Sequence, residues 1–159
     1  MDKRRVVDAL IEHIRREITT ISKAARDARD AATHEENRPE NSKDTRAIEA
    51  SYLAGAQAAR ARELEATCTA LATMRLYSFA DGRPIGSTAL VELEREGATQ
   101  LYFLSQYFGG VRLAVDESDV HVITTKSPLG AELLAKSEGD IIEVPTRGGL
   151  IEYKICHVQ

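Results

Sequence analysis

The sequence predicts an α+β protein in which an N-terminal antiparallel α-helical coiled-coil hairpin precedes a C-terminal β-sheet domain with one short helix. The first observation is that residues 1–75 hold only one of the ten glycines and one of the four prolines. The second is a heptad pattern in the same residues, and the third is a series of short β-branched runs between glycine turns in residues 76–159. Few helix breakers predict long helices, and frequent glycine predicts short elements joined by turns. We therefore expect two domains, 1–75 and 76–159.

Two heptad series predict the helices of the first domain. Mostly apolar residues recur at alternating spacings of four and three from Val7 to Ala32, and again from Ala47 to Leu71. Such spacing places each series along one seam of a helix. The segment 35–44 between them is short and rich in turn and cap residues, so we expect an antiparallel hairpin with its tip there. The seam turns to alanine toward the tip, which gives a thin rod suited to a narrow cavity, although alanine seams also recur in ordinary antiparallel helix pairs.

The second domain is predicted to be an antiparallel sheet with one packed helix. Apolar and β-branched runs predict seven strands, at 76–80, 87–93, 100–104, 111–115, 120–124, 141–144 and 151–157. Gly-containing turns separate several of these strands. A helix is expected at 129–136, because Ser127 is a good N-cap and Pro128 suits the first helical position. The pair Glu138-Gly139 is expected to end it.

Composition excludes several classes of protein. The chain has 159 residues and a formal net charge of −4, which disfavours a protein that coats nucleic acid through phosphate contacts. Two cysteines cannot build a Cys-rich zinc site or a disulfide framework, and they suit a reducing compartment. No stretch approaches the ~18 apolar residues that span a bilayer, and Asp8 and Glu12 interrupt the apolar run behind the basic N-terminal residues. We expect a cytoplasmic protein with no membrane partner.

Motifs of self-contained catalysis are missing from the sequence. There is no Gly-x-Ser-x-Gly, no His-Glu-x-x-His, no phosphate loop and no dinucleotide fingerprint. The four histidines are scattered, and Cys68 and Cys156 are better explained as packing residues than as nucleophiles. The aromatic residues at 102, 103, 107 and 108 favour a hairpin core over a base-stacking platform, because no basic residue lies among them. The protein is thus not expected to be an enzyme.

Carboxylates concentrate at the predicted tip. They are Glu35, Glu36, Glu40 and Asp44, with Glu49 one turn further on. Magnesium keeps several waters and binds weakly to one or two free carboxylates, so this tip could not hold the ion usefully alone. It could complete a site whose other ligands belong to a partner. The alternative is a solvated loop that carries charge.

Residues 127–140, S-P-L-G-A-E-L-L-A-K-S-E-G-D, resemble the C-terminal signature of the GreA/GreB transcript cleavage factors, roughly S-P-L-G-x-A-L-L-G-K-x-x-G-D. Residues 85–91, I-G-S-T-A-L-V, resemble the stretch that opens the same domain of that family. The likeness is specific over about 75 residues, and the N-terminal hairpin agrees with the family in architecture.

The resemblance implies a fold and a mechanism. The C-terminal domain would be FKBP-like and would dock on bacterial RNA polymerase, while the coiled coil enters the secondary channel. Acidic tip residues would then help to hold the second magnesium of the polymerase, which cleaves the 3′ end of its own backtracked RNA. The protein would contact the nascent RNA end only indirectly. It would be monomeric and would bind no magnesium stably by itself.

The tip departs from the family pattern D-L-S-E-N-x-E-Y-x-A-A. Matching Glu40-Asn41 to E-N places Asn37 at the leading Asp, whereas matching Tyr52 to the family tyrosine places Thr45 and Ile48 at the two key acids. The ligands we predict are Glu40 and Asp44, which share a face if helical, with Glu36 as a third.

Three functions from different classes remain open. The first is a polymerase-binding elongation factor, which either stimulates cleavage or acts as a non-cleaving regulator or inhibitor through the same channel. The second is a peptidyl-prolyl isomerase on an FKBP-like sheet, which an aromatic content of 5% without tryptophan disfavours. The third is a coiled-coil adaptor whose heptad seam pairs between chains.

Overall fold

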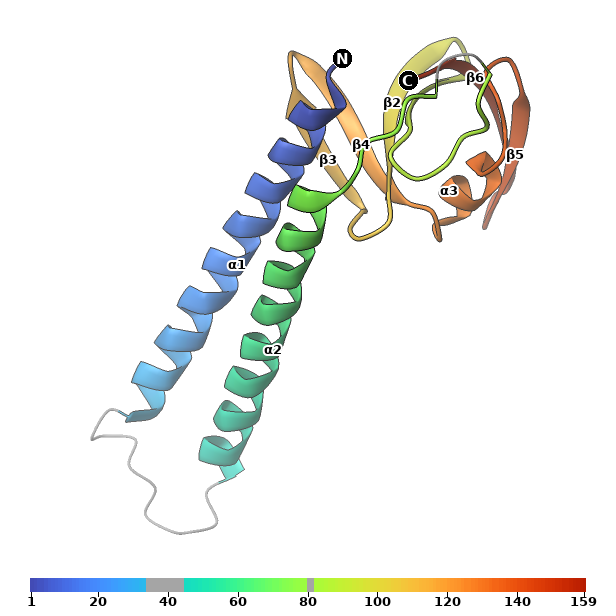
Figure 1. Ribbon diagram of the computed structural model, residues 1–159. Coiled ribbons are helices and arrows are strands. Elements are labelled where there is room, and N and C mark those ends of the chain that lie inside the picture. The colour runs from blue at the N-terminus through green and yellow to red at the C-terminus, as the bar shows by residue number, and fades with distance from the viewer. Residues whose placement is uncertain (34–44, 80–81) are drawn as a thin grey trace. The chain divides into compact units, whose positions relative to one another are not determined.

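The computed structural model describes residues 1–33, 45–79 and 82–159 (Figure 1). Two long helices, α1 (Lys3–Thr33) and α2 (Thr45–Thr73), precede a six-stranded sheet with one short helix, α3 (Pro128–Leu133). The predicted α+β class is thereby confirmed. The chain forms two compact units, Ile11–Ala70 and the combination of Met1–Leu10 with Leu71–Gln159.

The sequence predicted a division into domains 1–75 and 76–159. That division remains a prediction and is not the same as the division into these two compact units. Within the described ranges, no helix combines the length and the apolar character needed to cross a bilayer.

The two helices within Ile11–Ala70 run antiparallel (Figure 1). Glu17 of α1 pairs with Arg60 of α2 at 3.5 Å between carboxylate and guanidinium. The charges of Arg15 and Glu12, which precede Glu17, influence the pKa of the Cys68 thiol, and Cys68 follows Arg60 in sequence. Sequence order is therefore opposite along the two helices.

Burial in this unit follows the predicted heptads. Ile11, Ile14 and Leu64 are buried, whereas the seam residues further along α1 and those closer to the start of α2 are only partly covered. The partly covered seam residues are Ile18, Ile21, Ala25, Ala28, Ala54, Gln57 and Ala61. Alanine removes less apolar surface from water than isoleucine, so the apolar stabilisation of the pair falls along its length.

The sheet has the strand order β3-β4-β2-β1-β6-β5. Its strands are β1 (Leu90–Arg95), β2 (Ala98–Ser105), β3 (Val111–Val115), β4 (Ser118–Thr124), β5 (Ile141–Thr146) and β6 (Gly149–Val158). All neighbours are antiparallel except β2 and β4, which pair in parallel with Leu101 opposite Val120. The expectation of a wholly antiparallel sheet was wrong, because the chain lays β4 rather than β3 beside β2 and leaves β3 at the edge.

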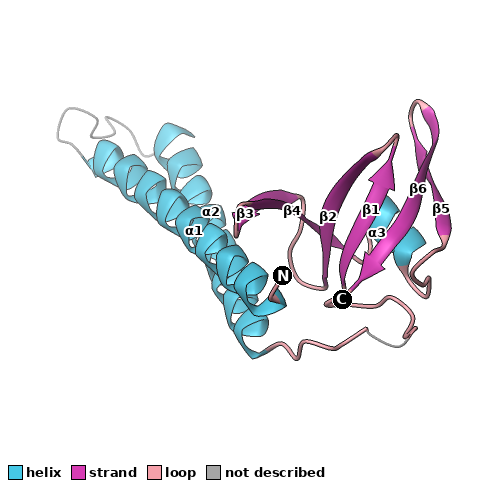
Figure 2. Ribbon diagram, turned by 90° about the horizontal axis from the view of Figure 1, so that it is seen from above, coloured by secondary structure: helices cyan, strands magenta, loops and turns pink. Residues whose placement is uncertain are grey.

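A hydrophobic core cluster lies on the face of the sheet that α3 covers (Figure 2). Alternate residues of single strands point inward, such as Val91 and Leu93 of β1 and Ile142 and Val144 of β5, as the two-residue period of a strand requires. Leu133 of α3 is fully buried among them. The short helix therefore closes the core of this unit.

Residues 76–79 do not form the predicted first strand. The Tyr77 N–H donates to Thr88 Oγ1 at 3.0 Å, and the Tyr77 carbonyl accepts from Lys3 Nζ. Phe79 is buried against the sheet core. The Tyr77 backbone thus forms its hydrogen bonds with side chains rather than with a neighbouring strand, so this apolar run did not become a strand.

The short helix begins where predicted but ends three residues early, at Leu133 rather than Lys136. Ala135 has φ +63°, a left-handed conformation that stops the helix. Its N–H donates to the Ile85 carbonyl at 3.0 Å, and the Ile85 N–H donates to the Lys136 carbonyl at 2.7 Å. This tie to the chain before β1 decides where the helix ends.

Candidate functional site

The predicted ligand residues of the tip, Glu36, Glu40 and Asp44, lie outside the described residues, as does Glu35. Glu49, the remaining carboxylate of that group, is exposed on α2. Among residues 1–33, 45–79 and 82–159, no three His, Cys, Asp or Glu side chains are placed to hold a metal ion together. The magnesium site at the tip therefore remains a prediction.

Near its first turns, α2 carries an apolar hollow that the sequence reasoning missed. The hollow measures about 700 Å³ and is lined by Ile48, Ser51, Tyr52, Gly55 and Ala56. Tyr52 is 77% exposed and Ile48 52% exposed, and neither lies on the heptad seam. Large apolar side chains in water mark interaction surfaces. The available signal was that these side chains are four residues apart and off the seam.

The S-P-L-G segment is built around an N-cap. The Ser127 hydroxyl accepts a hydrogen bond from the Gly130 N–H at 3.1 Å and donates to the Thr124 carbonyl at 2.7 Å. Pro128 occupies the first turn, where its missing N–H has no helical partner to lose. Gly130 is required because a Cβ there would lie 2.0 Å from the Thr124 carbonyl oxygen. These residues hold α3 against the end of β4.

The S-E-G-D segment is a second structural clasp. The Ser137 N–H donates to the Asp140 carboxylate at 2.8 Å, and the Ile155 N–H donates to the Asp140 carbonyl at 2.9 Å. Gly139, at φ +93°, donates its N–H to the Ile155 carbonyl at 2.8 Å. The signature thus encodes backbone connections between the turn and β6, and its carboxylate serves the turn.

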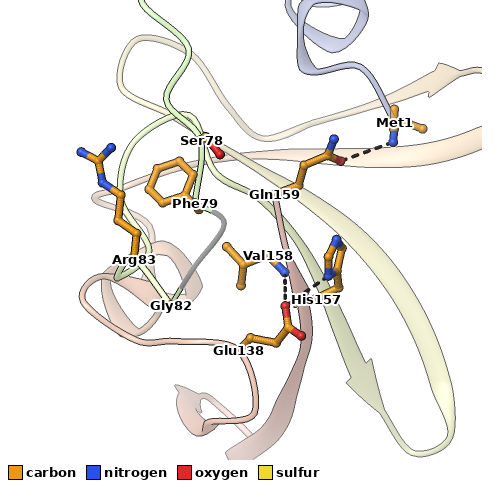
Figure 3. A pocket seen from close by; sticks show the side chains of 9 residues that line it. All are labelled: Met1, Ser78, Phe79, Gly82, Arg83, Glu138, His157, Val158 and Gln159. Atoms are coloured by element: carbon orange, nitrogen blue, oxygen red, sulfur yellow. Dashed lines mark hydrogen bonds and ion pairs between the residues drawn. The ribbon is translucent and has the colours of Figure 1, made fainter.

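A cavity of about 630 Å³ lies where the two chain ends meet the segment before β1 (Figure 3). The Glu138 carboxylate accepts from the Val158 N–H and contacts His157 Nδ1, both at 3.1 Å. The N-terminal ammonium donates to Gln159 Oε1 at 3.3 Å. On the other side of the cavity, Arg83 lies beside the Phe79 ring. The cavity is polar on one wall and cationic–aromatic on the other.

The remaining singled-out side chains have structural surroundings. His121 stacks on Tyr102 at 5.2 Å between ring centroids. Burial raises the pKa of the Cys68 thiol, which makes it a poorer nucleophile at neutral pH. The aromatic cluster is only in part a core, because Phe103 is buried in β2 whereas Tyr107 is 47% exposed.

Comparison with known proteins matches residues 85–159 to the family described as "Transcription elongation factor, GreA/GreB, C-term". Transcription elongation factor GreA of Pseudomonas syringae pv. tomato is 44% identical over 46 residues, which are 28% of this chain and 29% of that protein. GreA factor homolog 1 of Thermus thermophilus is similar in structure with a TM-score of 0.38 and 19% identity, over 94% of each chain. The GreA/GreB elongation factor of Nitrosomonas europaea has a TM-score of 0.37 and 23% identity, over 60% of this chain and 78% of that one.

The matched segment contains both clasps described above. Residues 85–159 are thus similar to the C-terminal domain of the GreA/GreB transcription elongation factors.

Proposed function

We propose that this protein binds bacterial RNA polymerase, inserts the α1–α2 arm into the secondary channel, and stimulates cleavage of backtracked RNA. The observation that carries the proposal is a GreA/GreB C-terminal domain joined in one chain to two long antiparallel helices. The helices have 31 and 29 residues, which at about 1.5 Å per residue makes each roughly 45 Å long. Such an arm is long enough to act far from a docking surface on the sheet domain.

The proposed chemistry lies with Glu40 and Asp44, and with Glu36 as a third ligand. Carboxylate oxygens are the side-chain ligands that magnesium prefers, so the donor set fits the ion. A bound magnesium supplies charge stabilisation to the attacking and leaving oxygens of phosphodiester hydrolysis. The chain itself contributes ligands and position, and the polymerase performs the reaction. FKBP-like folding of the sheet domain is part of the same proposal.

Cleavage of a stalled, backtracked elongation complex tests the proposal directly. Adding the protein with magnesium should shorten the RNA from its 3′ end, and the double variant Glu40→Ala, Asp44→Ala should abolish the shortening. The matched control is Glu65→Ala, which removes an exposed carboxylate of α2 far from the tip in sequence.

Binding and cleavage must be measured separately. Co-migration with polymerase should survive the double substitution, because the two acids are proposed as ligands rather than docking residues. Loss of binding in that variant would contradict the ligand role, and failure of the unmodified protein to co-migrate would reject polymerase as the partner.

A non-cleaving regulator that uses the same channel is the second candidate function. Two observations favour it: neither match of the tip to the family pattern preserves both key acids, and Ile48 and Tyr52 expose apolar surface near the start of α2. Protein contacts made by the arm would use that surface without any metal. Polymerase binding with unchanged RNA length would select this function.

A further inference from the structure

Three cationic side chains lie over two aromatic rings, and two residues of this group, Phe79 and Arg83, line the cavity of Figure 3. Lys3 Nζ lies 5.0 Å from the centroid of the Phe79 ring, and the Arg83 guanidinium lies 5.6 Å from the same centroid. Arg83 also lies 5.1 Å from the centroid of Tyr77, and Arg75 lies 5.3 Å from it. All five residues belong to the unit formed by Met1–Leu10 and Leu71–Gln159. We name them the cation–aromatic cluster.

The positive charges of this cluster have no carboxylate partner among the described residues. The ion pairs found in residues 1–33, 45–79 and 82–159 join other side chains. Lys3 donates to the neutral carbonyl of Tyr77, and burial lowers the pKa of its ammonium. Asp81, which lies between Phe79 and Arg83 in sequence, is outside the described residues. Attraction to an aromatic ring holds each cation beside that ring without neutralising its positive charge.

The geometry distinguishes between two kinds of anionic partner, which are a nucleic acid and the carboxylates of a protein. Phe79 is only 5% exposed and has two cations beside it, so its ring offers no open face for base stacking. Tyr77 is 39% exposed, but a base stacked on it would share the ring with two guanidinium groups. A guanidinium stacked on a ring keeps its N–H edge available for two parallel hydrogen bonds to a carboxylate. The net charge of −4 also opposes a long polyanion more than it opposes a few carboxylates.

We propose that the cation–aromatic cluster is a docking surface for an acidic segment of a protein partner. Arg75 and Arg83, both exposed, bind carboxylates through their guanidinium edges, and both guanidinium groups lie against the Tyr77 ring. Lys3 adds a third positive charge at the Phe79 side. This surface lies in the sheet-containing unit, so the proposal does not depend on cleavage activity or on the tip residues.

Fluorescence anisotropy of a labelled oligoglutamate peptide against the full chain tests the proposal. Arg75→Gln and Arg83→Gln should each weaken binding by roughly tenfold, because each removes one charge-assisted bidentate contact. The matched control is Arg147→Gln, an exposed arginine of the β5–β6 turn in the same unit, which should leave the affinity unchanged. Binding should weaken as salt is raised.

Further variants separate the role of the ring and the guanidinium fork from charge alone. Arg83→Lys keeps the charge but loses the fork, so it should bind nearly as weakly as Arg83→Gln. Tyr77→Phe keeps the ring and should bind like the unmodified protein, whereas Tyr77→Leu should bind several-fold more weakly. Thermal unfolding of each variant establishes that it is folded.

Three results would overturn the proposal. The first is an Arg75→Gln, Arg83→Gln double variant that binds oligoglutamate with unchanged affinity. The second is an Arg147→Gln variant that loses as much affinity as Arg75→Gln or Arg83→Gln. The third is tighter binding of a labelled oligothymidylate through the same two arginines, which would assign the surface to nucleic acid instead.

Discussion

Replacing Gly130 with alanine should destabilise the sheet-containing unit, although glycine-to-alanine changes in helices ordinarily stabilise. The new Cβ would lie 2.0 Å from the Thr124 carbonyl oxygen and 2.9 Å from Ser127 Oγ. That oxygen cannot simply withdraw, because it accepts hydrogen bonds from the Ser127 hydroxyl at 2.7 Å and the Ser127 N–H at 3.0 Å. Alanine therefore has to displace α3 and break its cap.

The size of the effect follows from these two losses. Overpacking a tight site costs about 1–3 kcal/mol, and loss of an N-cap costs about 1 kcal/mol. The free energy of unfolding should thus fall by roughly 3 kcal/mol, and the melting temperature by roughly 10 °C. Scanning calorimetry and near-ultraviolet circular dichroism measure both quantities.

Gly148→Ala is the matched control. Its Cβ would have no neighbour nearer than Thr146 Oγ1 at 3.9 Å, so the substitution should be neutral or stabilising by under about 1 kcal/mol. If Gly130→Ala melts together with the unmodified protein or with Gly148→Ala, the close approach to the Thr124 carbonyl is not what holds α3.

Ala135→Gly should raise the free energy of unfolding by about 1 kcal/mol in calorimetry, because Ala135 has φ +63° where the family signature has glycine; an unchanged melting temperature would mean that the residue is not strained. Ile14→Ala should cost about 2–4 kcal/mol, since Ile14 is fully buried, whereas Ile18→Ala should cost clearly less because Ile18 is only partly covered. Chemical unfolding followed by far-ultraviolet circular dichroism compares them, and equal costs would contradict the graded seam. The hydrogen bond from Arg112 lowers the pKa of the Asp119 carboxyl. The contribution of this ion pair to folding stability is therefore fully present at pH values above the ordinary aspartate pKa near 3.9, and it is lost as the pH falls through the lowered pKa of Asp119. Arg112→Gln should return the Asp119 pKa, followed by NMR titration, toward its ordinary value, and an unmoved pKa would remove this ion pair as the cause.

Local patterns predicted the helical arm well. The heptad residues of α1 and α2 are buried or partly buried wherever the structure describes their burial, because a helix brings residues three and four apart onto one face. The N-cap at Ser127 was likewise predictable, since cap and helix lie within a few residues of each other. The tip carboxylates stay a sequence prediction, because Glu36, Glu40 and Asp44 lie outside the described residues.

Local patterns failed where distant segments compete. The apolar run at 76–79 has strand-like composition, but its backbone groups bond to Thr88 and Lys3 instead of a strand. The run of small and apolar residues after α3 suggested a longer helix, but Ala135 bonds to Ile85, fifty residues earlier in the chain. In both cases a partner remote in sequence offered a hydrogen bond that propensity does not register.

The sequence alone determined two heptad helices, the capped start of α3 and the family signature, because each of these depends on residues that are close together in the chain. The tertiary structure alone decided the parallel pairing of β2 with β4, the glycine requirement at position 130, and the gathering of Lys3 with Tyr77 and Phe79. Those features depend on contacts between residues that are far apart in the chain. Such a contact forms when the free energy gained by burial exceeds the entropy cost of closing the loop, and that balance depends on the competing contacts of the whole chain.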